Sequence, residues 1–229
     1  NRYIKELHDS VCGLSNLEVL SLVRCEKLLS LPAQIGNLKN LQEIDLTDAS
    51  ELSSLPESIG DLSSLRKLTI GGHQGSGNKV LKTLPSTIVN LTSLEILCLD
   101  KCKELESLPS DLGNMKSLRV LLIGKFAIFI SNIISAFVIY FELTIVLFSE
   151  CKAVKELPSS IGSLSNLVEL SISKCIGLTC IPPEIGDCEN LEDLVMNKCK
   201  GITSLPDTVC EMKSLCMLDL RACKKLVSL

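Results

Sequence analysis

The sequence predicts an α/β solenoid in which short parallel strands form one curved sheet. Two observations carry this prediction. A segment of the form L-x-x-L-x-L-x-x-C-x-x-L-x-x-L-P, followed by x-x-I-G-x-L, recurs along the 229 residues. Prolines also close successive copies at spacings of 24, 29, 24, 49, 24 and 24 residues, at Pro32, Pro56, Pro85, Pro109, Pro158, Pro182 and Pro206. A fixed period in this range indicates stacked repeats rather than a chain folded around one central core.

Each copy is expected to supply one strand and one short helical piece, as in a leucine-rich repeat. The L-x-x-L-x-L stretch alternates apolar and variable residues, which predicts a strand with its leucines inward. Stacking gives a curved parallel sheet of about eight or nine strands on the concave side. In the tail, Pro is placed where a helical turn can begin and Gly where one can stop, so short helical or 3₁₀ pieces are expected on the convex side. After a partial copy at residues 4–14, the strand stretches begin at Leu17, Leu41, Leu65, Leu94, Leu118, Leu167, Leu191 and Leu215.

Five extra residues interrupt the third copy within Gly71–Val80, whose sequence is GGHQGSGNKV. Gly72 and Gly77 have the spacing of a phosphate-binding loop, but Asn78-Lys79 follows instead of Lys-Ser or Lys-Thr, and no helical pattern comes after. We therefore expect a flexible surface excursion here rather than a nucleotide site.

A second interruption divides the chain into three parts. Joining Ile123 directly to Ser149 restores the template, because removal of residues 124–148 returns the 49-residue spacing to 24. Those 25 residues contain all five Phe residues of the chain, and no charge lies between Lys125 and Glu142. The expected organisation is repeats of period 24 over 1–123, a foreign apolar insert over 124–148, and repeats over 149–229 with a truncated end. Because both ends cut a repeat, we expect a fragment of a longer protein.

Three interpretations of the insert remain open. It can be a retained intron translated in frame, because Phe, Ile, Leu and Val arise from T-rich codons. It can be a membrane segment, although the uncharged run of 16 residues is shorter than the roughly 20 that span a bilayer. It can also be a degenerate extra turn, since Leu143, Val146, Phe148 and Cys151 fit the template.

Six of the twelve cysteines share the ninth position of the template, which predicts a column of buried, reduced structural thiols. The chain contains no C-x-x-C motif and only two histidines, so no metal site is predicted. This cysteine usage favours a reducing cytoplasm, with the nucleus also possible as a location. The six are Cys25, Cys102, Cys151, Cys175, Cys199 and Cys223.

The variable strand positions are expected to face solvent on the concave side, which is the usual binding surface of a solenoid. The face mixes both signs of charge and lacks Trp and Tyr anchors, so recognition by charge complementarity is expected. The predicted protein-binding residues are Glu43, Asp45, Arg66, Lys67, Glu95, Lys101, Glu169, Lys174, Asp193, Lys198, Asp219 and Arg221.

Other classes of function lack their residue patterns. The net charge is −4 with both signs interspersed, which does not favour nucleic-acid binding. Cys98 and Cys216 occupy outward positions, but the repeat places neither histidine beside them, so no catalytic site is predicted. No cofactor and no small-molecule substrate are expected in this chain, and membrane association is not favoured.

Stretches such as LPESIGDLSSLRKL and LPSSIGSLSNLVELSISKC resemble the repeat domain of plant nucleotide-binding leucine-rich-repeat disease-resistance proteins. They are most similar to those with an RPW8-type coiled-coil amino terminus, and the likeness covers residues 4–123 and 149–229. The resemblance implies an intracellular immune receptor whose repeats sense pathogen effectors or hold a nucleotide-dependent switch inactive. The nucleotide would bind an upstream domain outside this chain, and the partner would be an effector or another domain of the same polypeptide.

Two alternatives stay open. A stand-alone signalling scaffold resembling plant Ras-group leucine-rich-repeat proteins shares L-P-x-x-I-G-x-L, but that group usually carries Asn at the ninth position and a 23-residue period. The ectodomain of a surface receptor kinase usually carries Gly-x-Ile-Pro repeats, which only Ile181-Pro182 resembles here. The cysteine column and the 24-residue period favour the immune receptor.

Overall fold

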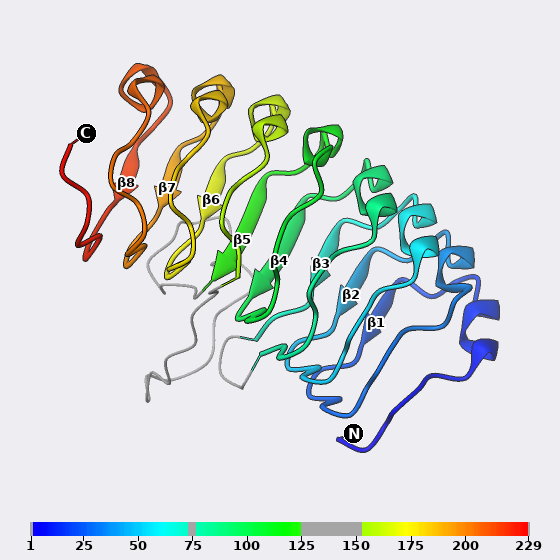
Figure 1. Ribbon diagram of the computed structural model, residues 1–229. Helices are drawn as coiled ribbons and strands as arrows, with labels where there is room; N and C mark the ends of the chain where they lie inside the picture. The colour runs from blue at the N-terminus through cyan, green and yellow to red at the C-terminus, as the bar shows by residue number, and fades with distance from the viewer. Residues whose placement is uncertain (1, 73–76, 125–152, 229) are drawn as a thin grey trace.

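The chain folds into one row of stacked turns, each contributing a short strand to a continuous parallel sheet (Figure 1). The computed structural model describes residues 2–72, 77–124 and 153–228. Strand order follows chain order from β1 to β8, which confirms the predicted parallel sheet. The strands are β1 Val19–Ser21, β2 Glu43–Asp45, β3 Lys67–Thr69, β4 Ile96–Asp100, β5 Val120–Gly124, β6 Glu169–Ser171, β7 Asp193–Val195 and β8 Met217–Asp219.

Every described helical element is a short 3₁₀ piece, and these pieces line one edge of the row in Figure 1. In five turns a proline is the N-cap, with backbone angles near φ −65° and ψ +145°, because its fixed φ suits the residue that leads into the helix. The pieces are η1 Asp9–Gly13, η2 Ile35–Asn37, η3 Glu57–Asp61, η4 Ser86–Asn90, η5 Leu112–Asn114, η6 Ser159–Ser163, η7 Pro183–Asp187 and η8 Asp207–Glu211.

The template glycine serves close packing rather than helix termination. Gly60 lies inside η3, and a Cβ built on it would stand 2.3 Å from the carbonyl oxygen of Thr87 in the next turn. Gly36, Gly113 and Gly162 approach the following turn in the same way. Any side chain larger than hydrogen would therefore push neighbouring turns apart at this position.

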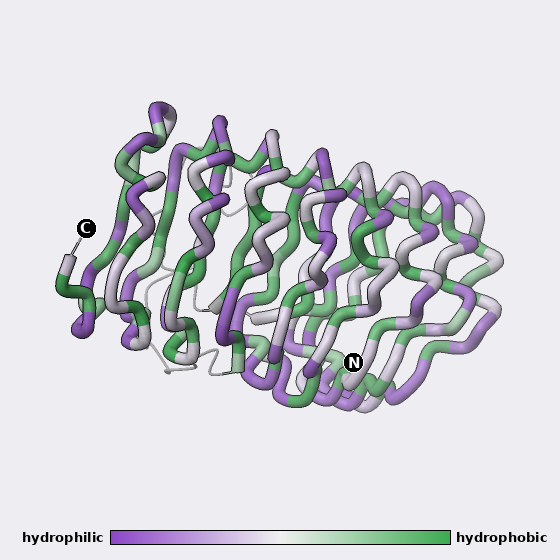
Figure 2. The backbone as a smooth tube through the Cα atoms, turned by 45° about the horizontal axis from the view of Figure 1, so that its top comes forward, coloured by the Kyte–Doolittle hydropathy of each residue, from purple (hydrophilic) through white to green (hydrophobic). Residues whose placement is uncertain are grey.

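The core is a set of aliphatic columns that run the length of the solenoid. Figure 2 shows apolar segments recurring from turn to turn along the backbone. The central strand residues, such as Ile44, Leu68 and Leu97, are fully buried, and their neighbours in each strand point to the opposite face. Each turn therefore buries its leucines against the turn before and the turn after, as expected for a repeat array. No described helix is long and apolar enough to cross a bilayer.

The 49-residue spacing leaves the sheet uninterrupted. Strands β5 and β6 pair directly, with Leu121 opposite Leu170, as Ile44 lies opposite Leu68 across a 24-residue spacing. This pairing leaves no room for another strand between β5 and β6. Most of the predicted insert, and Cys151 of the cysteine column, lie outside the described residues, so the insert stays a prediction.

The first interruption is described at its two ends, on either side of residues 73–76. Gly71, Gly72, Gly77 and Asn78 are all buried, and Asn78 is fully so. Asn78 occupies the ninth template position: its Nδ2 donates to the carbonyls of Ala49 (3.0 Å) and Leu52 (2.8 Å), and its Oδ1 accepts from two amides of its own turn. The extra residues enter before the ninth position and the template resumes at Gly77, so the surface excursion expected here stays a prediction for residues 73–76, which lie outside the described residues.

The cysteine column is confirmed for its five described members, which are buried and reduced. The thiols of Cys199 and Cys223 each donate to a carbonyl of the preceding turn, at 3.0 Å in both cases. Burial raises the pKa of Cys199 to about 12, so this thiol stays protonated and available as a donor. The side chains of Asn78, Cys199 and Cys223 thus all donate hydrogen bonds that connect one turn to the turn before it.

In every described full turn, the residue directly before the ninth template position has a left-handed backbone conformation. The positive φ values lie between 57° and 66° and belong to Arg24, Asp48, Gly77, Lys101, Lys174, Lys198 and Ala222. This conformation points the backbone amide of Lys198 at the carbonyl of Arg221 (2.8 Å), and the amides of Arg24, Asp48 and Lys174 bond to the next turn in the same way. The recurring basic residues therefore sit at a turn with a fixed backbone requirement.

Replacement of Lys198 by Gly should stabilise the protein by roughly 0.5 kcal/mol. The left-handed region costs an L-residue about 1–2 kcal/mol, and the greater freedom of Gly in the unfolded chain offsets part of that gain. Lys198 is exposed, so its side chain buries little area that would be lost. Urea unfolding followed by circular dichroism measures the change. Lys198→Ala is the control, and an Ala variant as stable as the Gly variant would contradict the backbone explanation.

Candidate protein-binding surface

The concave face presents two columns of side chains, one on each side of the buried central residue of every strand. The strand register places equivalent residues side by side, so residues 24 apart in sequence become lateral neighbours. The first column is Val19, Glu43, Lys67, Ile96, Val120, Glu169, Asp193 and Met217. The second is Ser21, Asp45, Thr69, Cys98, Leu122, Ser171, Val195 and Asp219.

Charged residues predicted for binding pair with one another over β2 to β4. Lys67 Nζ donates to Glu43 Oε1 at 2.8 Å, and an Arg66 nitrogen lies 3.5 Å from Glu95 Oε1. Asp45 Oδ1 accepts the backbone amide of Thr47 at 2.9 Å. These side chains remain half-exposed or exposed, so each ion pair contributes little to stability but defines a pattern of charge that a partner can read.

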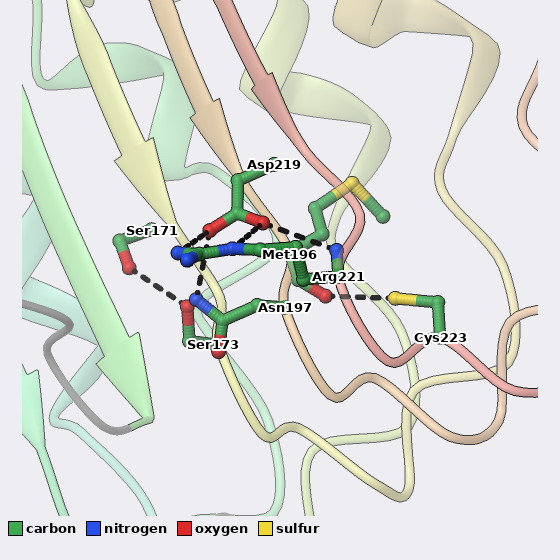
Figure 3. A network of polar contacts seen from close by, with 7 residues as sticks. All are labelled: Ser171, Ser173, Met196, Asn197, Asp219, Arg221 and Cys223. Atoms are coloured by element: carbon green, nitrogen blue, oxygen red, sulfur yellow. Dashed lines mark hydrogen bonds and ion pairs between the residues drawn. The ribbon is translucent and has the colours of Figure 1, made fainter.

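A second pairing occurs at β8. Nε and Nη2 of Arg221 donate to the two carboxylate oxygens of Asp219 at 2.8 and 2.7 Å, and Asn197 Nδ2 donates to the same carboxylate at 3.2 Å (Figure 3). The bonds from Arg221 hold the pKa of Asp219 at about 2. The predicted residues Asp219 and Arg221 are therefore brought together as one bidentate unit.

Four of the predicted binding residues are not exposed. Lys101, Glu169, Lys174 and Asp193 are between 2% and 8% exposed, so the expectation that they face solvent is wrong. Lys101 and Lys174 sit at the left-handed turn, where backbone geometry rather than recognition fixes the position. Lys198, the third lysine of that column, is exposed.

Glu169 is the most perturbed carboxyl group on this face. Its Oε1 is buried and has no hydrogen-bond partner among the described residues. Burial is the main cause that raises the pKa of Glu169 to about 7, and the negative charges of Asp193 and Asp100 raise it further. Burial, together with Glu192, also raises the pKa of Asp193. The carboxyl pair thus favours protonation, unlike the carboxylate of Asp219.

An apolar patch on β4 and β5 was not foreseen from the sequence. Ile96, Cys98, Val120 and Leu122 form a cluster separate from the main core, on the opposite face of the sheet. Burial raises the pKa of Cys98 well above its usual value, which argues against a reactive thiolate there. The signal was present, because residues 96–99 and 120–123 are continuous apolar runs, and such runs are typical of strands buried on both faces.

The described residues bring together no catalytic or metal-binding constellation. No group of three or more His, Cys, Asp or Glu side chains in residues 2–72, 77–124 and 153–228 is arranged to hold a metal ion. What this surface offers chemically is a set of half-exposed charges on β2 and β3, with Arg66 and Glu95 directly before β3 and β4.

Comparisons with known proteins agree with this architecture. A family model described as "Leucine-rich repeat region" matches residues 46–135. The leucine-rich repeat domain of the type III effector XopL shares 19% sequence identity, and its structure matches at a TM-score of 0.66 over 94% of this chain and 73% of that chain. The chain has the leucine-rich-repeat fold. At this level of identity the likeness establishes the fold, and function has to be argued from the chain's own residues.

Two further solved structures of leucine-rich-repeat proteins match this chain at TM-scores below 0.5. A protein of Leptospira interrogans shares 19% identity, covering 99% of this chain and 93% of that chain at a TM-score of 0.27. The ectodomain of the membrane receptor kinase GASSHO1/SCHENGEN3 from Arabidopsis thaliana shares 18% identity, covering 94% and 31% at a TM-score of 0.36. A search of the curated proteins found no match.

Proposed function

We propose that this leucine-rich-repeat chain is the protein-recognition region of an intracellular plant immune receptor. The exposed part of the concave face, over β1 to β4, carries the recognition, and the partner is another domain of the same polypeptide or a pathogen effector. The observation that carries the proposal is the pattern of half-exposed charges on Glu43, Asp45 and Lys67, which the strand register presents on one surface.

Charge complementarity is the mode of recognition that this surface supports. Glu43 and Lys67 carry opposite charges at neighbouring positions of the first column, and Arg66 and Glu95 form a second pair of opposite charges directly before β3 and β4. Such surfaces set specificity and association rate more than affinity. A reversible contact of this kind suits an autoinhibitory interface that has to release when a signal arrives.

The receptor assignment rests on sequence. The cysteine at the ninth position, the 24-residue period and the L-P-x-x-I-G-x-L tail are the features that resemble the plant disease-resistance proteins. In that setting the chain acts without a cofactor of its own, and the nucleotide belongs to an upstream domain.

The test is a charge swap that preserves the ion pair. In a Glu43→Lys/Lys67→Glu variant the pair is retained and only its direction is reversed, so fold stability should change by less than about 0.5 kcal/mol. The full transcript is read first, and the nucleotide-binding domain expected upstream is expressed separately as the probe. Calorimetry should show the swap weakening the complex about tenfold, because each like-charge contact now opposes binding.

A matched control is available one turn earlier. Lys27 and Glu51 form an ion pair across the same 24-residue spacing but lie after the strands, outside both concave columns. Their swap should leave the complex unchanged. Equal affinities for the concave swap and the unmodified chain would overturn the proposed surface. A transcript without a nucleotide-binding domain would instead favour a stand-alone scaffold.

A further inference from the structure

The glycine column on the side opposite the sheet is interrupted at Val89 in η4, and also at Cys12 in η1 and Cys210 in η8. In the glycine column, Gly36, Gly60, Gly113 and Gly162 allow the carbonyl of the following turn to approach closely. Val89 occupies this position in η4. Because even a methyl group would collide with the next turn in the glycine-containing repeats, the isopropyl group of Val89 has to hold η5 farther from η4.

A hydrogen bond that connects neighbouring turns elsewhere is also missing between η4 and η5. The hydroxyls of Ser58, Thr87 and Thr208 each donate to a carbonyl of the preceding turn. The equivalent residue at the start of η5 is Asp111, and an ionised carboxylate has no hydrogen to donate to the carbonyl of Ser86. Glu184 is the equivalent residue in η7, but Gly162 is retained in the turn before it, whereas the boundary between η4 and η5 lacks both the glycine and the hydroxyl.

The result is a cleft of about 190 Å³ between these two 3₁₀ pieces. Pockets for drug-sized ligands are larger, at roughly 300–1,000 Å³, so this cleft has room for one side chain rather than a whole small molecule. Apolar groups from Leu84, Val89 and Leu108 line it together with the hydroxyls of Ser86 and Ser110. Among the described residues that line it, Asp111 alone carries a charge.

We propose that this cleft accepts one arginine side chain of a protein partner. The aliphatic stem of arginine packs along the apolar wall, and the guanidinium donates to the Asp111 carboxylate and the neighbouring hydroxyls. The planar guanidinium has five N–H donors, which suits a site with one carboxylate and several hydroxyl acceptors. This contact lies away from the concave face, so it is independent of the proposed function and survives its failure.

The experiment uses the full chain and the peptide acetyl-Gly-Arg-Gly-amide as the probe, with binding followed by NMR of the backbone amides. Saturable shifts are expected at Val89, Ser110 and Asp111. Acetyl-Gly-Glu-Gly-amide and acetyl-Gly-Leu-Gly-amide should produce none there. Asp111→Asn should weaken binding of the arginine peptide about fivefold, which is the effect of one partly exposed ion pair.

Two further variants separate the cleft from general electrostatics. Val89→Gly restores the glycine column, lets η5 approach η4 and should abolish the shifts while the circular dichroism spectrum is unchanged. Asp187→Asn removes an exposed carboxylate from η7 and should leave binding unaltered. Equal shifts with the leucine or glutamate peptide, or full affinity in the Asp111→Asn variant, would overturn the proposal. Shifts confined to other acidic residues would overturn it as well.

Discussion

Replacement of Asn78 by Ala is expected to destabilise the protein by about 3–5 kcal/mol. The side chain is fully buried and takes part in four hydrogen bonds, two donated across to the preceding turn and two accepted within its own turn. Each contributes about 1 kcal/mol, and the backbone amides of Val80 and Leu81 would lose their acceptor in a buried site. Urea unfolding monitored by circular dichroism gives the loss directly.

The structure supplies the matched variants for this experiment. Asn78→Cys should cost clearly less than Asn78→Ala, because cysteine fills the equivalent slot in other turns and its thiol donates to the preceding turn. Asn37→Ala, at an exposed position in η2, should change stability by less than about 0.5 kcal/mol. If Asn78→Ala were as mild as Asn37→Ala, the hydrogen bonds of Asn78 would not be holding the third turn in place.

The second large effect is a dependence on pH that originates at Glu169. The pKa of Glu169 is about 7 in the folded protein against an ordinary value of 4.5, so the folded state binds more protons than the unfolded state between these values. The stabilising contribution is therefore complete below pH 4.5 and is lost as the pH rises through 7. A difference of this size corresponds to roughly 3 kcal/mol.

The Glu169→Gln variant isolates this contribution. Glutamine keeps the size of the side chain and removes the charge, so the variant should gain stability relative to the unmodified chain as the pH rises from 5 to 8. Glu189→Gln, at an exposed position between η7 and β7, is the control and should follow the unmodified chain. Thermal unfolding at several pH values measures the difference. If the stability of Glu169→Gln and of the unmodified chain changed with pH in parallel, the pKa of Glu169 would not be raised in the folded protein.

The architecture could be predicted from the sequence because equivalent positions in successive copies of the repeat have to lie side by side. Once Leu20, Ile44 and Leu68 are recognised as equivalent, parallel pairing follows, and with it the lateral contact between Glu43 and Lys67. The direct pairing of β5 with β6 agrees with joining Ile123 to Ser149, but the sequence left that junction open beside a degenerate extra turn.

The misses have physical reasons. Asn78 was overlooked because the extra residues shift it away from its expected number, although NKVLKTLP aligns with CKELESLP once the shift is allowed. The burial of Lys101 and Lys174 could not be predicted, since lysine is almost always exposed. The perturbed pKa of Glu169 depends on burial and on Asp193 in the next strand, neither of which the local sequence reports.

The restriction of contacts to adjacent turns governs how the molecule bears mechanical load. Within the described part of the chain, each strand packs on the strands of the neighbouring turns, and each 3₁₀ piece packs on its own neighbours in the same way. Tension applied along the row is therefore carried in series, and no long-range brace shares it. Turns would peel away singly, each releasing roughly 80 Å of extended chain for 24 residues. Strands β4 and β5 pair over five residues where every other described pair of strands has three, so under such tension the turns on either side should separate before β4 parts from β5.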